Sequence, residues 1–245
     1  AMSSYVSISS IKGIFKELES KKIKFGVVPI ENSSNGIVND TINGFTNFNS
    51  KIVAEVILNI HHTLATTCDK ISDIKKIYSK DIAFDQCRKF LTNFGLDEVE
   101  LIPVESTTKA AKLAANEPNS AAICPHVAAK LYNLPILFEN IEDKDNNKTR
   151  FFILSDFENS PSGNDKTSIL VNLPDEQGVL VRFLNDFNNA GINLTKIKSN
   201  IVEGNSIFFI DFDGHKDDEN IKKVLQKHKS SIKVLGSYVK EIKDI

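Results

Sequence analysis

The sequence has no tryptophan, one methionine and only three cysteines in 245 residues. The cysteines (Cys68, Cys87 and Cys124) lie far apart without a CxxC pair, which excludes a zinc knuckle and a disulfide framework and favours a reducing cytoplasm. No apolar stretch approaches the roughly 18–20 residues that cross a bilayer, so no membrane span is expected. No run of five basic residues occurs and the formal net charge is -2, so neither nucleic acid nor an anionic membrane is an expected partner.

Several catalytic motifs are absent as well. The chain has no GxSxG, P-loop or GxGxxG sequence, which leaves a serine hydrolase, an NTPase and a Rossmann dinucleotide-binding protein without support. His61 and His62 follow a predicted strand without a partner at metal-ligand spacing, so no metal site is expected. Cys87 and Cys124 fall in apolar patterns and are expected to be core thiols rather than nucleophiles.

What the sequence does have is an ordinary globular composition. Hydrophobic residues make up 41% and charged residues 25%, which is typical of a folded protein rather than a disordered or fibrous one. At about 100–200 residues per domain, the length favours two domains. A polar stretch with Pro161 and Gly163 marks the boundary, so we expect a first domain at 1–157, a linker at 158–166 and a second domain at 167–245.

The first domain alternates predicted strands with predicted helices. Strands are expected at Ile23–Ile30, Ile52–Ile60, Ile74–Tyr78, Glu98–Val104 and Ala121–Cys124. Helices are expected at Ile82–Phe94, Thr107–Ala115 and Val127–Leu131. This alternation predicts an α/β fold with a mostly parallel sheet and helices on its faces.

The second domain has a more compact pattern. Strands are expected at Thr167–Leu173, Asn193–Ser199, Ser206–Phe212 and Ile232–Val239, and helices at Gln177–Ala190 and Glu219–His228. A turn at Glu203–Asn205 joins the two central strands as a hairpin. The order βαββαβ is that of the ferredoxin-like fold.

Polar residues follow the first predicted strand where a ligand could bind. The strand ends in Glu31–Ser33, and Ser34 or Asn35 could cap a helix beginning near Gly36. In α/β sheets, ligands bind beyond the carboxyl ends of strands, where helix N-termini offer free N–H groups to anions. An ordinary strand–turn–helix with a capping residue explains the pattern equally well.

Two further segments carry polar residues or glycine at notable places. Asn146–Phe152 is predicted to be a polar turn that leads into an apolar strand, with the hydroxyl of Thr149 beside the guanidinium of Arg150. Such a pair could donate to a leaving oxygen and hold a carboxylate, although a turn with a surface cation is the simpler interpretation. Gly178–Val181 opens a predicted helix, which is a weak signal because glycine is common near helix starts.

Taken together, these segments resemble a known family. The runs GVVPIENSSNGIV at 26–38, AAICPHVAAKLYNLPIL at 121–137 and ENIEDKDNNKTRFFIL at 139–154 resemble prephenate dehydratase, and Val104–Ala110 fits the same family. The remainder, Thr167–Ile245, resembles the ACT regulatory domain that such enzymes carry. The resemblance covers nearly the whole chain.

The resemblance implies a fold and the position of the substrate. The catalytic domain of the family is periplasmic-binding-protein-like, with two α/β subdomains, and the second would span roughly 61–141. Prephenate would lie in the cleft between them. The Glu31–Ser33 and Thr149–Phe151 turns would then face the same cleft, although they are over a hundred positions apart.

The resemblance also implies a role for individual residues. Catalysis is assigned to Thr149, Arg150 and Phe151. Substrate binding is expected from a set of polar residues: Glu31, Asn32, Ser33, Ser106, Thr107 and Asn147. Binding of the effector L-phenylalanine is expected from Gly178, Val179, Leu180, Asn193, Leu194 and Ser199. No metal or organic cofactor is expected.

The three catalytic positions have different expected roles. Thr149 would donate a hydrogen bond to the departing hydroxyl of prephenate, since a threonine hydroxyl is too weakly acidic to protonate it outright. Arg150 is either a substrate contact or a buried structural cation. Phe151 would pack so as to position the turn.

The chain departs from the family in two places. Family members begin with a strand, a glycine-rich turn and a helix, and nothing similar precedes Tyr5–Ile11, which resembles the second strand of the family. We therefore expect a chain without that strand and helix, and the parent could carry a chorismate mutase domain upstream. Lys198–Ile201 stands where the family reads Glu-Ser-Arg-Pro, so we expect L-phenylalanine to bind but do not expect strong feedback inhibition.

The resemblance implies a cytoplasmic homodimer or homotetramer that acts in phenylalanine biosynthesis. The alternative is a non-catalytic, two-lobed small-acid-binding protein with an amino-acid-sensing ACT domain, because periplasmic binding proteins share this architecture. The threonine at 149 discriminates between the two, since a pure binder does not need it.

Overall fold

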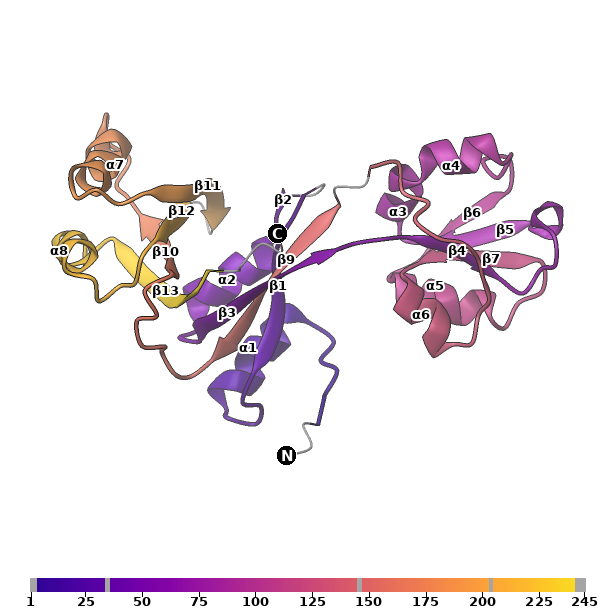
Figure 1. Cartoon of the computed structure of the whole chain (residues 1–245), viewed down its shortest axis with the longest axis horizontal. Helices are drawn as coiled ribbons and strands as arrows, with labels where there is room; N and C mark the ends of the chain where they lie inside the picture. Colours follow the sequence, from indigo (N-terminus) through magenta and orange to yellow (C-terminus); the bar gives the residue numbers. More distant parts are fainter. Residues whose placement is uncertain (1–3, 34–35, 145–146, 203–204, 241–245) are drawn as a thin grey trace. The chain divides into compact units, whose positions relative to one another are not determined.

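The structure is a computed structural model that describes residues 4–33, 36–144, 147–202 and 205–240. The chain forms two compact units (Figure 1). The first unit combines Ala1–Leu58 with Thr149–Ile245, and the second is Asn59–Lys148. Within the described ranges, no helix has the length and apolar character needed to cross a membrane.

The N-terminal part of the first unit is a four-stranded sheet with two helices. Its elements are α1 (Ile11–Glu19), β1 (Gly26–Asn32), β2 (Gly36–Ile37), α2 (Asn39–Asn47), β3 (Lys51–Asn59) and β9 (Lys148–Ser155). The strand order is β2-β1-β9-β3. Strand β9 follows the second unit in the sequence, so this sheet combines segments from both sides of that unit.

Two predictions for the start of the chain are wrong. The strand expected at Tyr5–Ile11 is absent, and helix α1 begins at Ile11 because the Ser10 hydroxyl accepts a hydrogen bond from the Gly13 amide at 3.0 Å, which caps the helix. Near Gly36 the chain forms the short strand β2, and helix α2 begins only at Asn39. The predicted capping residues Ser34 and Asn35 lie outside the described residues, as do Asn146, Glu203 and Gly204.

The second unit is a five-stranded sheet with helices. Its elements are β4 (Thr63–Thr66), η1 (Ile71–Asp73), β5 (Lys76–Ser79), α3 (Asp81–Gln86), α4 (Arg88–Asn93), β6 (Glu100–Pro103), α5 (Thr107–Ala114), β7 (Ser120–Cys124), α6 (His126–Leu131) and β8 (Ile136–Phe138). The strand order is β6-β5-β7-β4-β8.

The helix expected at Ile82–Phe94 is two helices, because the backbone leaves the helical conformation at Cys87. Cys87 and Cys124 are buried, as expected for core thiols, and burial raises the pKa of Cys124 to about 11.

The prediction of a mostly parallel sheet is wrong. In the first unit, β1 pairs antiparallel with both β2 and β9. In the second unit, β5 pairs parallel with β6 and β7, but β4 pairs antiparallel with β7 and β8. Alternation of strands and helices implies parallel strands only when each helix leads to the next neighbouring strand, and here β4, β8 and β9 enter their sheets from distant parts of the sequence.

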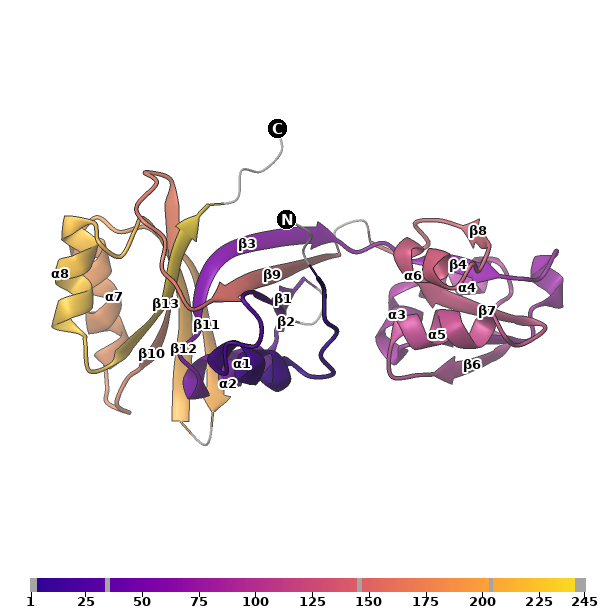
Figure 2. The same ribbon diagram turned by 90° about the horizontal axis from the view of Figure 1, so that it is seen from below.

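The C-terminal domain has the predicted ferredoxin-like order. Its elements are β10 (Asp165–Asn172), α7 (Val179–Asn189), β11 (Leu194–Val202), β12 (Asn205–Asp213), α8 (Glu219–Lys227) and β13 (Ile232–Val239). The sheet order is β11-β12-β10-β13, with every pairing antiparallel. Helices α7 and α8 cover one face of this sheet (Figure 2). The α/β fold class with a βαββαβ domain is confirmed.

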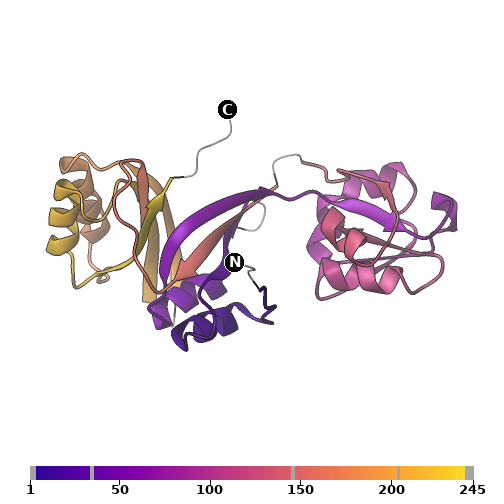
Figure 3. The same ribbon diagram turned by 60° about the horizontal axis from the view of Figure 1, so that its bottom comes forward.

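The other face of the C-terminal sheet packs against the N-terminal sheet of the same unit (Figure 3). One hydrophobic cluster contains Phe152 and Ile52 from the N-terminal sheet together with Phe209 and Tyr238 from the C-terminal sheet. The backbones approach so closely that a Cβ atom on Gly236 would lie 2.2 Å from the carbonyl oxygen of Ile52. The C-terminal domain therefore shares a buried core with strands β3 and β9.

Candidate active site

The two polar segments singled out in the sequence are direct neighbours. Strands β1 and β9 pair antiparallel, with Asn32 opposite Thr149 and Glu31 opposite Arg150. The side-chain amide of Asn32 donates a hydrogen bond to the Thr149 hydroxyl oxygen at 2.8 Å. Thr149 and Arg150 belong to β9, so the polar turn predicted at this point is instead the first part of a strand.

The hydrogen bond from Asn32 orients the Thr149 hydroxyl. Because the hydroxyl oxygen accepts from the amide, the hydroxyl hydrogen can be donated to another group. A hydrogen bond accepted by a hydroxyl polarises it and makes it a better donor in turn. The Asn32–Thr149 pair is thus a donor held in place from a neighbouring strand.

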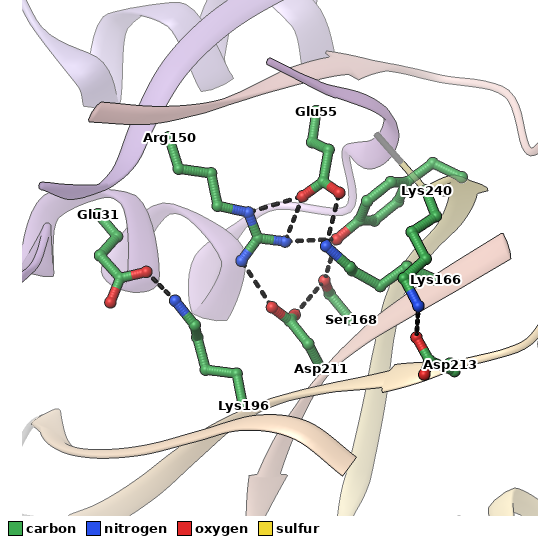
Figure 4. A network of polar contacts seen from close by, with 10 residues as sticks. Glu31, Glu55, Arg150, Lys166, Ser168, Lys196, Asp211, Asp213 and Lys240 are labelled. Atoms are coloured by element: carbon green, nitrogen blue, oxygen red, sulfur yellow. Dashed lines mark hydrogen bonds and ion pairs between the residues drawn. The ribbon is translucent and has the colours of Figure 1, made fainter. Parts of the chain in front are cut away.

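Arg150 points to the opposite side of β9, into the C-terminal domain (Figure 4). Its side chain is 8% exposed, and its Nη1 atom lies 2.6 Å from a carboxylate oxygen of Asp211 on β12. Its Nε atom donates to Glu55 on β3 at 2.7 Å, and its Nη2 atom donates to the Tyr238 hydroxyl at 2.9 Å. The guanidinium carbon also lies 4.7 Å from the ring centre of Phe152.

The polar groups around Arg150 form a closed ring of hydrogen bonds. The Ser168 hydroxyl lies 2.6 Å from Asp211 and must donate to it, since an ionised carboxylate only accepts. The Tyr238 hydroxyl, 2.6 Å from Ser168, therefore donates to Ser168 while it accepts from Arg150. Arg150 closes the ring by donating to the other oxygen of Asp211.

The charges in this buried cluster balance. Glu55 is held by Arg150 and also by Lys166 at 2.6 Å, so two cations face the two carboxylates of Glu55 and Asp211. Burial alone would raise the pKa of the Glu55 carboxyl, but Arg150 and Lys166 outweigh it and lower that pKa. Burial would lower the pKa of Arg150, but Tyr238, Asp211 and Glu55 raise it, so the ion pair between Arg150 and Glu55 persists across the physiological pH range.

Glu31 also contacts the C-terminal domain. Its carboxylate forms an ion pair with Lys196 on β11, and both side chains are mostly buried. Ser33 is exposed at the end of this segment, and Phe151 is half-buried on β9, opposite Pro29. Of the six predicted residues in this region, Asn32 and Thr149 contact each other, whereas Glu31 and Arg150 form ion pairs with the C-terminal sheet.

The remaining predicted substrate residues belong to the second unit. Ser106 caps helix α5, with its hydroxyl oxygen accepting from the Lys109 amide at 3.1 Å, and Thr107 is the first residue of that helix. The side-chain amide of Asn147 is buried and lies 3.3 Å from the side-chain oxygen of Gln86. Gln86 was not predicted to take part in the site.

The two adjacent histidines have partners that the sequence did not indicate. His61 lies 2.6 Å from Glu142, and the backbone amide of His62 donates to the same carboxylate at 2.8 Å. The His62 ring lies 2.8 Å from Gln86. Throughout the described part of the chain, no group of three or more His, Cys, Asp or Glu side chains could hold a metal ion.

A hollow of about 640 Å³ lies at one end of the C-terminal domain. Gly178, Val179 and Leu180 line it, together with Phe208 of β12. Gly178 has a φ of 75° at the start of α7, a conformation that favours glycine. This hollow therefore brings together half of the predicted effector residues.

The other three predicted effector residues lie on β11 or just before it. Asn193 donates to Asp213 at 2.8 Å, and Leu194 packs against the core beneath α7 and α8. Ser199 is exposed, opposite Phe208 in the strand pairing. None of these three is among the residues that line the hollow within the described chain.

Charged residues inside apolar strands are the signal that sequence reasoning missed. Asp211 stands in the run IFFIDFD and Glu55 in the run IVAEVIL. Strand alternation places Asp211 on the same face as Ile207 and Phe209, which are buried. A carboxylate on a buried apolar face requires a cationic partner, and Arg150 could have been proposed as that partner.

Comparison with known families assigns both parts of the chain. A family model for prephenate dehydratase matches residues 1–159, and a model for the ACT domain matches residues 167–229. These matches agree with the resemblance carried by the motifs around Asn32 and Thr149.

Individual relatives extend the similarity over most of the chain. A bifunctional chorismate mutase/prephenate dehydratase from Aquifex aeolicus is 40% identical over 97% of this chain and 67% of its own length. A prephenate dehydratase from Methanocaldococcus jannaschii is 39% identical over 94% of this chain and 86% of its own length. The chain spans about two thirds of the length of the bifunctional relatives that it matches.

A solved structure has the same fold. The crystal structure of a prephenate dehydratase from Arthrobacter aurescens in complex with L-Phe superposes with a TM-score of 0.86. It is 30% identical to this chain, and the match covers 96% of this chain and 81% of the other.

Proposed function

Because the chain belongs to the prephenate dehydratase family, we propose that it converts prephenate to phenylpyruvate in the biosynthesis of L-phenylalanine. The observation that carries the proposal is the Asn32–Thr149 hydrogen bond, which joins the two motifs of the family across one strand pair. It holds a polarised hydroxyl donor at the edge where polar residues of both strands gather. No metal or organic cofactor enters the proposed reaction.

The reaction needs a donor rather than a strong acid. The bond between the ring and its carboxylate breaks, its electron pair enters the ring, and the bond to the 4-hydroxyl breaks, so that CO2 and hydroxide leave and the ring becomes aromatic. The hydroxide is then protonated by solvent to give water. Thr149 donates a hydrogen bond to the departing oxygen as negative charge develops on it, and such donors act most strongly when they are already oriented.

The other predicted site residues have different proposed tasks. Asn32 orients Thr149, while Ser33, Ser106 and Thr107 supply N–H or O–H donors for the substrate carboxylates, and Asn147 supports the polar cluster with Gln86. The geometry favours the buried-cation alternative for Arg150, since carboxylates and a phenol surround its guanidinium. Phe151 packs beside Thr149 and Arg150 on β9.

The proposed activity is tested by incubating the chain with prephenate and measuring phenylpyruvate by its enolate absorbance in alkali. We expect phenylpyruvate to form catalytically at neutral pH, well above the rate of the same mixture with heat-denatured protein. Binding of prephenate without turnover would contradict the proposal and favour the non-catalytic small-acid-binding alternative.

We further propose that L-phenylalanine binds in the hollow at the start of α7. Gly178 places the first amide groups of this 11-residue helix beside the hollow, where they can receive a carboxylate. Val179, Leu180 and Phe208 supply apolar surface. Lys198 and Asn200 replace residues that the family uses near the effector, so we propose binding without strong feedback inhibition.

Isothermal calorimetry with L-phenylalanine should show saturable binding. We expect Gly178→Ala to weaken it roughly tenfold, which is about 1.4 kcal/mol, because the new methyl group would strain the backbone and lie 3.2 Å from Arg182. The control is Gly191→Ala, which has a similar φ of 69° but open space around it at the other end of α7. Equal weakening by both variants, or no heat with the unaltered chain, would contradict this site.

The setting of the proposed reaction follows from the same family. We propose a cytoplasmic homodimer or homotetramer, and the free state of Cys68, Cys87 and Cys124 supports a reducing compartment. Relatives named as bifunctional chorismate mutase/prephenate dehydratases support a chorismate mutase as the source of the substrate.

A further inference from the structure

Four of the charged residues between the N-terminal sheet and the ACT sheet form two matched pairs. Glu31 and Arg150 stand opposite each other in the β1–β9 pairing. Lys196 and Asp211 stand opposite each other in the β11–β12 pairing. Each member of the first pair contacts the oppositely charged member of the second, Glu31 with Lys196 and Arg150 with Asp211. We call these four residues the clamp.

The clamp lies next to the proposed catalytic pair along both strands. Asn32 follows Glu31 on β1, and Thr149 precedes Arg150 on β9. Successive strand residues point to opposite faces, so Arg150 reaches toward the ACT sheet while the hydroxyl of Thr149 meets Asn32. A shift of the backbone at Arg150 therefore moves Thr149 as well.

The pairing of β9 with β1 is irregular at this point, although β9 also pairs with β3 on its other side. The pairing register shifts between Pro29 and Glu31, opposite Phe151 and Arg150, and such a bulge interrupts the regular hydrogen-bond ladder. Side-chain contacts can add support where this bulge interrupts the β1–β9 ladder. The ring formed by Asp211, Ser168 and Tyr238 around Arg150 adds it from the ACT side.

We propose that the ACT domain positions the catalytic hydroxyl, with Asp211 as a positioning residue that acts on Thr149 through Arg150. This inference rests on the proposed function of Thr149. Strand β12 also lines the effector hollow with Ser206 and Phe208, so the hollow and the clamp share one strand. The ACT domain then holds a residue of the active site in position, in addition to binding the effector.

The test compares Asp211→Asn with Asp186→Asn. Asp186 is a matched control because it is also an ACT aspartate with two side-chain partners, Lys227 and His228, each 2.7 Å away, but it lies on α7, which covers the other face of the ACT sheet. Since a misplacement of about 1 Å can cost 10²-fold in rate, we expect Asp211→Asn to lower kcat by roughly 10- to 100-fold with little change in KM. Asp186→Asn should leave both unchanged.

Two further readouts separate positioning from general weakening of the fold. Hydrogen–deuterium exchange should be faster in Asp211→Asn at the backbone amides of Thr149–Phe152 and unchanged there in Asp186→Asn. In a Thr149→Ala background, Asp211→Asn should lower the residual rate no further, because the group that it positions is already gone. If Asp211→Asn does not fold, Lys196→Gln replaces it, with the exchange of β1 amides as the readout.

Wild-type kcat and wild-type exchange in a folded Asp211→Asn chain would overturn the inference. So would a rate loss that multiplies with that of Thr149→Ala. An unaltered chain that makes no phenylpyruvate would count against the proposed function instead, and the exchange measurements would still decide whether Asp211 holds strand β9.

Discussion

Replacing Thr149 with alanine should lower kcat for phenylpyruvate formation by about 10²-fold or more, the scale of a lost transition-state donor. The substitution removes the hydroxyl that accepts from Asn32 at 2.8 Å and that we propose donates to the departing oxygen. KM should change little, because the interaction strengthens only as charge develops on the leaving group. Steady-state kinetics with prephenate measures both constants.

Two variants control for loss of structure. Thr149→Ser keeps the hydroxyl and should retain most of the activity. Thr46→Ala removes an exposed hydroxyl from α2, where it donates to the Ile42 carbonyl, and should leave kcat unchanged. A Thr149→Ala chain with near-normal kcat would refute the assignment of this residue.

Replacing Arg150 with methionine should destabilise the first unit by about 3–5 kcal/mol, the usual cost of breaking a buried ion pair from one side. The variant removes the guanidinium that pairs with both Asp211 and Glu55. It also removes the donor to Tyr238. Urea unfolding followed by far-ultraviolet circular dichroism measures the change in the free energy of unfolding.

A surface arginine is the control for this change. Arg182 on α7 lies 3.8 Å from Glu176, and its side chain is 63% exposed. Arg182→Met should cost about 0–1 kcal/mol, as exposed pairs do. If Arg150→Met were as stable as the unaltered chain, the cluster around Arg150 would not be the buried ion-pair network that its contacts indicate.

Much of the fold follows from local patterns. The βαββαβ order follows from the sequence element by element, because its strands and helices carry clear periodicities and the β11–β12 hairpin joins neighbouring segments. The N-terminal helix α1 was missed, since the capping role of Ser10 depends on a single hydrogen bond to Gly13. The break at Cys87 was missed as well, since the helical spacing of apolar residues continues across it.

The candidate site was predictable only in part. The motifs that contain Thr149 and Asn32 resemble those of the family, and this resemblance predicts both residues. Their contact depends on the β1–β9 pairing, which joins residues 117 positions apart. Arg150 could not be assigned, because a guanidinium beside a threonine is equally compatible with a substrate contact and with burial.

The sequence by itself determined the residue types, the local elements and the family to which they belong. The tertiary structure decided which strands run antiparallel, which charges meet and which side of β9 each side chain occupies. The physical reason is that periodicity and capping act over a few residues, whereas the partners of Arg150 come from three strands far apart in the chain. Only the packing of the two sheets brings Glu55, Asp211 and Tyr238 to one guanidinium.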